Sequence, residues 1–190
     1  VGFGGSCFKK DILNLVYLCE SYGLKAAADY WRQVVDFNNH QQERFVARML
    51  RAMFNTVAGK RLALLGFAFK ADTGDTRESP AIRIASLLAE ERAVVVVNDP
   101  QALDNARRDL SACADRIVFE ADPYRAVQDA DALALLTDWR LYRELDYARI
   151  FAAMRKPAFV FDGRNALDHE ALSRLGFNVY AVGKSPRTNA

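Results

Sequence analysis

The hydrophobic positions along the chain follow two different rules. Residues 8–22 and 25–55 carry apolar side chains at three- and four-residue steps, the spacing of one face of an α-helix. Gly23 stands between these two segments, where it can end the first helix. Farther along, short and continuously apolar runs alternate with amphipathic stretches. The pattern therefore predicts a helical region over residues 1–58 and a separate domain over residues 59–190.

The second region has the alternation of strands and helices that is typical of a parallel sheet. Six apolar runs are predicted to be strands: 61–66, 93–98, 116–119, 132–136, 158–161 and 177–181. The helices predicted between them are 80–92, 102–111, 123–130, 144–154 and 167–175. Strands without a polar face need helices on both sides of the sheet. We therefore predict an α/β fold with a doubly wound, Rossmann-like parallel sheet in the strand order 3-2-1-4-5-6, preceded by the helical region.

Three details concern packing. A predicted second helix of about 30 residues is long, and it suits a bridge between domains or subunits as well as a helix that covers its own domain. Within it, residues 38–42 (NNHQQ) are polar all round and predict a water-exposed turn. Residues 184–190 are predicted to form a frayed tail.

Composition narrows the classes of function. Apolar residues make up 51% and charged residues 26% of the chain, and a formal net charge of +2 gives no reason to expect a nucleic-acid partner. No apolar run approaches the roughly 20 residues that span a bilayer, so we expect neither a membrane role nor a leader. Three widely spaced cysteines, two distant histidines and no CxxC motif argue against a disulfide framework and a metal site. We expect a cytoplasmic protein and, because the sequence starts inside a glycine-rich motif, a fragment.

The first candidate chemistry lies in residues 1–11, VGFGGSCFKKD. The glycines lead into the predicted first helix, which places Cys7 beside unpaired backbone N–H groups and the positive end of the helix dipole. This setting favours the reactive thiolate form. Lys9, Lys10 and Asp11 add charges nearby, and the combination is typical of covalent catalysis. The alternative is that Cys7 is a small buried residue at a tight turn.

A second candidate site lies at the carboxyl edge of the predicted sheet, where doubly wound folds bind ligands. The loop 66–80 is not a GxGxxG loop, because bulky residues replace the small ones that such a loop needs. It carries Lys70 and Arg77, and Arg164 follows the fifth strand at the same edge. Three converging cations predict an anionic ligand such as a nucleotide diphosphate. The alternative for the loop is a solvated charged surface.

Two side chains next to these loops have local interpretations. Ser79 can cap the helix that starts at Pro80. Asp99 ends the second strand, where a Rossmann domain often holds a ribose-binding carboxylate, although an ordinary role in a turn suits it equally.

Four motifs resemble, in this order, the UDP-glucose 6-dehydrogenase family: VGFGGSCFKKDILNLVYL, FNTVAGKRLALLGFAFKADTGDTRESPAI, TDWRLYRELDYARI and KPAFVFDGRNAL. The resemblance implies an enzyme with an N-terminal NAD-binding domain, a central region whose long helix lies at a dimer interface, and a C-terminal UDP-sugar domain. This chain would match the end of the central region and the UDP-binding domain. NAD would then be bound mainly by a domain outside it, and we expect the 190 residues alone to be inactive.

The resemblance also implies roles for single residues. Cys7 would be the nucleophile that converts UDP-glucose to UDP-glucuronate through a thiohemiacetal and a thioester, with Asp11 serving the hydrolytic water. The implied substrate contacts are Val1, Gly2, Phe3, Gly4, Phe69, Lys70 and Arg164. The implied cofactor contacts are Cys7, Lys10 and Arg77. A homodimer or higher homo-oligomer is implied.

Two alternatives stay open. One is a non-catalytic module that binds nucleotide sugars or mediates dimerisation. The other is a related dehydrogenase that oxidises another sugar, such as GDP-mannose or UDP-N-acetylmannosamine.

Overall fold

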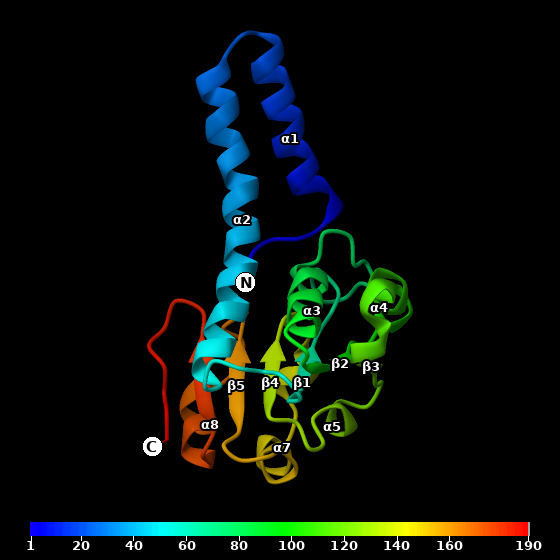
Figure 1. Cartoon of the computed structure of the whole chain (residues 1–190), viewed down its shortest axis with the longest axis vertical. Coiled ribbons are helices and arrows are strands. Elements are labelled where there is room, and N and C mark those ends of the chain that lie inside the picture. Colours follow the sequence, from blue (N-terminus) through cyan, green and yellow to red (C-terminus); the bar gives the residue numbers. More distant parts are fainter. Residues whose placement is uncertain (190) are drawn as a thin grey trace.

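The computed structural model describes residues 1–189, and it shows a helical hairpin that projects from an α/β domain (Figure 1). The hairpin consists of α1 (Ser6–Ser21) and α2 (Lys25–Ala52). Both predicted helices are confirmed, and Gly23 follows the end of α1 with a φ of 71°. The remaining elements are β1 (Arg61–Leu65), α3 (Pro80–Glu90), β2 (Val94–Asn98), α4 (Leu103–Asp109), the 3₁₀ helix η1 (Ser111–Arg116), β3 (Ile117–Phe119), α5 (Pro123–Ala126), β4 (Ala132–Leu135), α6 (Arg140–Arg143), α7 (Tyr147–Ala153), β5 (Phe159–Asp162), α8 (His169–Leu175) and β6 (Asn178–Ala181).

All six strands are parallel and lie in the order β3-β2-β1-β4-β5-β6, which confirms the predicted topology. The strand order reverses between β1 and β4, and Leu65 at the end of β1 pairs with Leu135 at the end of β4. In a doubly wound sheet, the loops that leave this point form the ligand-binding edge. The loops after β1 and β5 are therefore where a bound ligand is expected.

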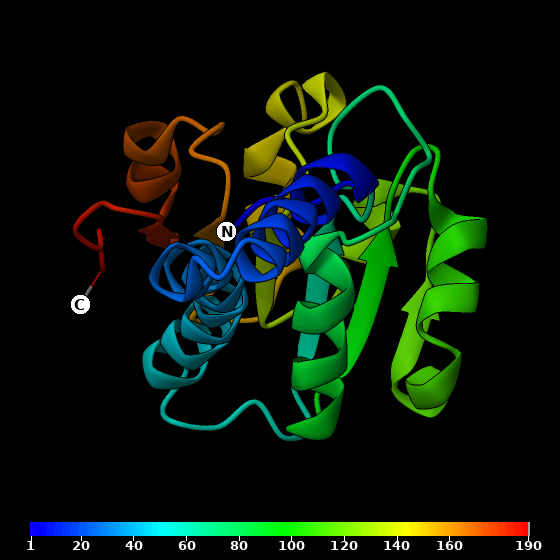
Figure 2. The same ribbon diagram turned by 90° about the horizontal axis from the view of Figure 1, so that it is seen from above.

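Helices cover both faces of the sheet, as its apolar strands require. One face of β1, through Leu62 and Leu64, packs against the second half of α2 and against α3. The opposite face, through Ala63 and Leu65, packs against the segments that carry α5, α6, α7 and α8. Viewed from above, α2 and α3 lie next to each other over one face (Figure 2). The long helix thus belongs to the core of the α/β domain at one end and to the hairpin at the other.

The far end of the hairpin has only a small core of its own, formed by Val16, Cys19 and Ala28. Much of its remaining apolar surface is exposed. The large apolar side chains exposed along the two helices are Phe8, Leu13, Tyr17, Leu18, Tyr22, Leu24, Tyr30 and Phe37. A concentration of this kind on one projection is typical of a protein–protein contact.

Residues 38–42 form a regular turn within α2, as predicted, but the prediction that this turn is exposed to water was wrong for two of its residues. Asn38 and Gln42 are only 9% and 5% exposed. Asn38 faces the glycine-rich loop and Gln42 lines a groove next to α3, whereas His40 is exposed. Asn38 accepts a hydrogen bond from the backbone of Phe3, which lies 35 positions away, and the composition of the helix does not reveal this contact.

Two predictions nearer the C-terminus also need correction. Residues 184–189 are tied down rather than frayed, because Arg187 and Val179 exchange backbone hydrogen bonds of 2.8 and 3.0 Å. Residue 190 of the predicted tail lies outside the described residues. The helix predicted over 144–154 is shorter than expected, because only α7 lies in that range, and Asp146, between α6 and α7, caps α7 by accepting from Arg149 N.

Candidate functional site

Cys7 lies in the first turn of α1 and its side chain is exposed. The helix begins at Ser6, two residues earlier than predicted, and the Sγ atom lies 4.0 Å from the hydroxyl of Ser6. Gly5, the residue before the helix, has a φ of 88°, and no side chain caps this helix end. The thiol is therefore accessible at a helix start whose first backbone N–H groups have no side-chain cap.

The loop before Cys7 is fastened from three directions. It lies against the end of β5, against the middle of α2 and against the loop after β1. The bonds are Val1 N to Gly163 O (3.1 Å), Phe3 N to Asn38 Oδ1 (2.8 Å) and Gly5 N to Arg77 O (2.9 Å). Hydrogen bonds to two loops at the sheet edge and to one helix thus place the cysteine at the carboxyl edge of the sheet.

Close contact between the glycine-rich loop and loop 66–80 depends on Gly4. A Cβ atom at Gly4 would lie 2.6 Å from the backbone oxygen of Glu78 and 2.9 Å from Cβ of Phe69. An ion pair of 2.7 Å between Lys9 and Glu78 adds to the contact, but both side chains are partly exposed, so its contribution is small. The absence of a side chain at Gly4 brings the two loops together.

Phe69 is the residue around which the predicted substrate contacts meet. Its ring lies beside Gly5, and the ammonium group of Lys70 lies 5.5 Å from the centre of the ring. Arg164 donates from Nη2 to the carbonyl of Phe69 (3.2 Å) and from Nε to the carbonyl of Leu136 (2.6 Å). Lys70 and Arg164, predicted from distant motifs, are thus joined through one residue.

Arg164 has the properties of an anion-binding side chain. It is half-buried, and burial lowers the pKa of its guanidinium below the usual value. Both of its hydrogen-bond acceptors are neutral carbonyl oxygens, and a guanidinium has five N–H donors. Three donors and the positive charge are left to interact with a ligand, and the carbonyls fix the direction in which they point.

Arg77 has a different partner from the other two cations. It pairs with Asp75 at 2.7 Å, which holds the pKa of the Asp75 carboxyl below its usual range and raises the pKa of Arg77. Arg77 and Lys10 both line a groove of about 650 Å³ beside the start of α1. Lys70 and Arg164 thus lie around Phe69, whereas Arg77 is held by a carboxylate and shares a groove with Lys10.

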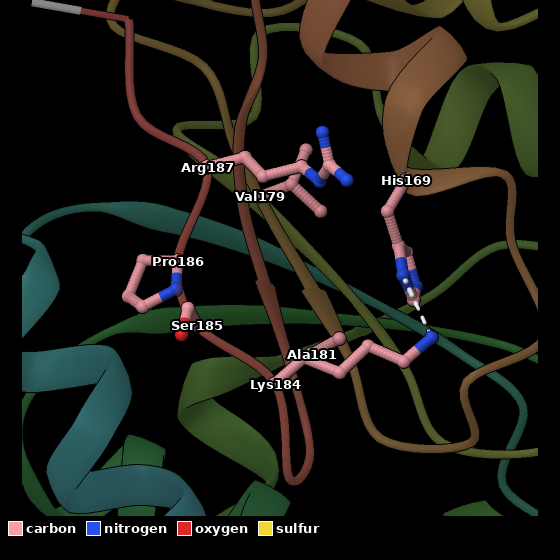
Figure 3. A pocket seen from close by; sticks show the side chains of 7 residues that line it. All are labelled: His169, Val179, Ala181, Lys184, Ser185, Pro186 and Arg187. Atoms are coloured by element: carbon pink, nitrogen blue, oxygen red, sulfur yellow. Dashed lines mark hydrogen bonds between the residues drawn. The ribbon is translucent and has the colours of Figure 1, made fainter.

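The turn that carries Arg164 is supported by a buried histidine–carboxylate contact. Asp162 is fully buried, accepts from the backbone N–H of Arg164 (2.9 Å), and lies 2.8 Å from Nε2 of His169. On its other side, His169 faces a pocket of about 320 Å³, where Nδ1 lies 3.3 Å from the ammonium of Lys184 (Figure 3). Through Asp162, this histidine supports the turn after β5 at the carboxyl edge of the sheet, and nothing in the local sequence indicates that role.

Asp99 serves the turn and not a ribose. Its carboxylate is 2% exposed and all of its contacts are with protein N–H groups. These donors are the backbone amides of Phe67, Ala68, Gln101 and Ala102 and the indole of Trp139. Of the two sequence interpretations, the structural one is therefore supported, and the carboxylate orders the beginning of loop 66–80. Ser79 also behaves as predicted, since its hydroxyl caps α3.

Sequence reasoning missed Asn38, which grips the glycine-rich loop. A signal was present, because Val35, Asn38, Gln42 and Phe45 recur at three- and four-residue steps along the buried face of α2. A polar residue in register with a buried apolar face needs a partner. The position of Asn38 along the buried face of α2, and not the polarity of the segment around it, indicated that the side chain is buried.

Within residues 1–189, no group of three or more His, Cys, Asp or Glu side chains could hold a metal ion. No helix in that part of the chain is long and apolar enough to cross a membrane.

Comparisons with known proteins show which family the sequence matches. The model of the UDP binding domain of the UDP-glucose/GDP-mannose dehydrogenase family matches residues 63–169, and the model of that family's central domain matches residues 1–40. UDP-glucose 6-dehydrogenase 2 of Oryza sativa subsp. japonica is 50% identical to the chain over 202 residues, and UDP-glucose 6-dehydrogenase 1 of Arabidopsis thaliana is 48% identical over 203. Each alignment covers 97% of this chain and 42% of the relative.

One solved structure is also similar to this chain. The UDP-glucose dehydrogenase from the archaeon Pyrobaculum islandicum has a TM-score of 0.76 and 31% identity, covering 97% of this chain and 38% of that one. The chain therefore spans less than half the length of the proteins it matches. Because the UDP-binding model alone covers more than half of its residues, the chain belongs to the UDP-glucose/GDP-mannose dehydrogenase family.

Proposed function

We propose that this chain supplies the nucleophile and the UDP-sugar site for the oxidation of UDP-glucose to UDP-glucuronate. The observation that carries the proposal is the docking of the Cys7 loop against Phe69, whose carbonyl also holds Arg164. It places a thiol, two cations and backbone groups at the ligand-binding edge of one sheet. The name UDP-glucose 6-dehydrogenase on relatives with half of their aligned residues identical points to the same chemistry.

Cys7 is the group that makes a covalent bond in this proposal. Its Sγ adds to the carbonyl carbon of the aldehyde formed by the first oxidation at C6, which gives a thiohemiacetal. Loss of hydride from that carbon and of the proton from its hydroxyl leaves a thioester, and attack by water releases the carboxylate and returns the thiol. Asp11 lies four residues after Cys7 on the same face of α1, so its carboxylate can orient this water.

Lys70 and Arg164 hold the anionic part of the substrate. A diphosphate presents several acceptor oxygens, and a guanidinium with free donors binds such groups in a defined orientation. The backbone of residues 1–4 lines the sugar. The intact GFAFKADTGDTRES loop favours UDP-glucose over GDP-mannose or UDP-N-acetylmannosamine.

The proposed cofactor is NAD⁺, which accepts the two hydrides when bound. The loop after β1 does not fit a dinucleotide, because Phe67 and Phe69 stand where small residues are needed. Lys10 and Arg77, together with the Cys7 region, fit its phosphates from the groove beside α1. We infer that residues outside these 190 bind most of the cofactor.

The exposed apolar side chains of the hairpin support a further part of the proposal. Tyr17 of α1 and Tyr22, directly after it, are 67% and 79% exposed, and Tyr30 of α2 is 66% exposed. We propose that residues 1–58 mediate homodimerisation through this surface and that residues 59–190 bind the UDP-sugar. The alternative of a non-catalytic binding or dimerisation module rests on the same surface.

The proposal is tested by turnover. A longer protein that carries this chain and an NAD-binding domain is expected to produce NADH from UDP-glucose, followed by its absorbance. The isolated 190 residues are expected to produce no NADH. The loop after β1 does not fit a dinucleotide, so the NAD⁺ that accepts the hydride would not be bound. NADH formation by the isolated chain at the rate of the longer protein would contradict the division of labour, and no turnover by the longer protein would contradict the function.

Binding gives an independent test. Calorimetry with UDP is expected to detect binding to the chain, and Arg164→Gln is expected to weaken it about tenfold or more through loss of charge-assisted hydrogen bonds. Arg174→Gln is a matched control, because Arg174 pairs with Glu170 on exposed α8. Equal affinity of the two variants for UDP, with both folded by thermal melting, would remove Arg164 from the substrate site.

A further inference from the structure

The side-chain amide of Asn38 binds both polar backbone groups of a single loop residue. Its Oδ1 accepts from Phe3 N at 2.8 Å and its Nδ2 donates to Phe3 O at 3.0 Å. Asn38 projects from the middle of α2 and is only 9% exposed, so water competes poorly for these bonds. The side-chain amide of Asn38 therefore makes the two hydrogen bonds that a neighbouring strand would make with the backbone of Phe3.

Gly2 shows that the contact is close-fitting. Its φ is 98°, and a Cβ atom at this position would lie 2.6 Å from Oδ1 of Asn38. The loop can approach the amide only because residue 2 has no side chain and can adopt this backbone conformation. Glycine at position 2 and asparagine at position 38 are thus the residue types that this close contact requires.

The fixed residue is connected to the start of α1. The ring of Phe3 packs edge-on against the ring of Phe8, with centroids 4.6 Å apart. Phe8 directly follows Cys7 in the first turn of the helix. The amide of Asn38, the backbone and ring of Phe3, and the ring of Phe8 form a continuous path of contacts to the residue beside the thiol.

We propose that Asn38 is a positioning residue that holds the loop, and with it Cys7, in the geometry for attack on the substrate aldehyde. The inference rests on the proposed role of Cys7 as the nucleophile. Asn38 does not touch the reacting atoms, and it acts through Phe3. A displacement of about 1 Å at a reacting group can lower a rate about 100-fold, so loss of this grip is expected to act on turnover.

The variants separate hydrogen bonding from packing. Asn38→Leu keeps the approximate size of the side chain but has no amide, and Asn38→Asp keeps an acceptor for Phe3 N–H while losing the donor to Phe3 O. Asn39→Ala is the matched control, because Asn39 is the neighbouring asparagine and lies less deeply. Thermal melting of each variant checks that the chain is folded.

Hydrogen exchange in the isolated chain measures the grip directly. The Phe3 amide is expected to exchange about tenfold faster in Asn38→Leu and to stay protected in Asn38→Asp and Asn39→Ala. In the longer enzyme, kcat is expected to fall about 100-fold in Asn38→Leu. The KM for UDP-glucose is expected to change much less than kcat, since the loop lines only the sugar and the anion contacts of Lys70 and Arg164 are unchanged.

The outcomes distinguish this inference from the proposed function. Unchanged Phe3 exchange in folded Asn38→Leu, or faster exchange with unchanged kcat, overturns the positioning role while leaving Cys7 as nucleophile. A rise in KM without a fall in kcat would likewise overturn it, because it would place Asn38 in substrate binding. Full activity of a Cys7→Ala enzyme would instead overturn the proposed function, and the exchange result would then describe a structural contact only.

Discussion

Replacing Cys7 by alanine, in a protein that carries this chain and an NAD-binding domain, is expected to lower kcat for UDP-glucose oxidation about 1,000-fold or more. Without the thiol, the aldehyde has no group on this loop that can form the covalent intermediate. Cys7→Ser is expected to be nearly as inactive, because a hydroxyl is a much weaker nucleophile than a thiolate at neutral pH. Steady-state NADH production measures both variants.

The chain offers a matched control for this experiment. Cys113 is a half-buried free thiol whose Sγ lies 3.5 Å from the carbonyl oxygen of Leu110, and burial raises its pKa. Cys113→Ala is expected to leave kcat within about twofold, since Cys113 does not line the groove beside the start of α1. Affinity for UDP, measured by calorimetry, is expected to be unchanged in Cys7→Ala. Normal turnover by that variant would contradict the covalent mechanism.

The core of the fold could be predicted because its information is local. Each strand is a run of apolar residues such as VVVVN in β2, and each is separated from the next by a segment with helical spacing. The hand and order of parallel crossovers are restricted, so these runs were enough to give the strand order. Local signals also identified the cap at Ser79 and the break after α1.

The parts that failed depend on contacts between distant residues. The register of α2 places Asn38 on its buried face, but the partner of Asn38 is Phe3, 35 positions away, and the helix sequence does not identify that partner. The tail is ordered because Arg187 finds the free edge of β6 at Val179. In both cases backbone groups of one segment are satisfied by another, a constraint that periodicity does not express.

The candidate site was predictable residue by residue but not in its arrangement. Lys70, Arg77 and Arg164 share one edge of the sheet, which follows from strand order. Their directions differ because Asp75 holds Arg77 and the carbonyl of Phe69 holds Arg164. Side-chain partners of this kind decide which cation faces which ligand, and they form only in the folded chain.

Asp99→Ala is expected to lower the free energy of unfolding by about 3–5 kcal/mol. The carboxylate ends β2 and accepts five hydrogen bonds, two of them at 2.7 and 3.0 Å from the first amides of loop 66–80. Its removal leaves those donors and the Trp139 indole buried without acceptors, and each such group costs about 1–3 kcal/mol. Part of this cost is offset, because a buried charge is removed as well.

Denaturant titration measures this difference, and Asp104→Ala provides the control. The Asp104 side chain is 99% exposed at the start of α4, five residues from Asp99, and its loss is expected to change the free energy of unfolding by less than about 0.5 kcal/mol. A value for Asp99→Ala within 1 kcal/mol of that control would show that the loop is held elsewhere. Since the same loop carries Phe69 and Lys70, a folded Asp99→Ala chain is also expected to bind UDP more weakly than the original. Asp99 would then contribute both to the stability of the sheet edge and to the geometry of the proposed UDP site.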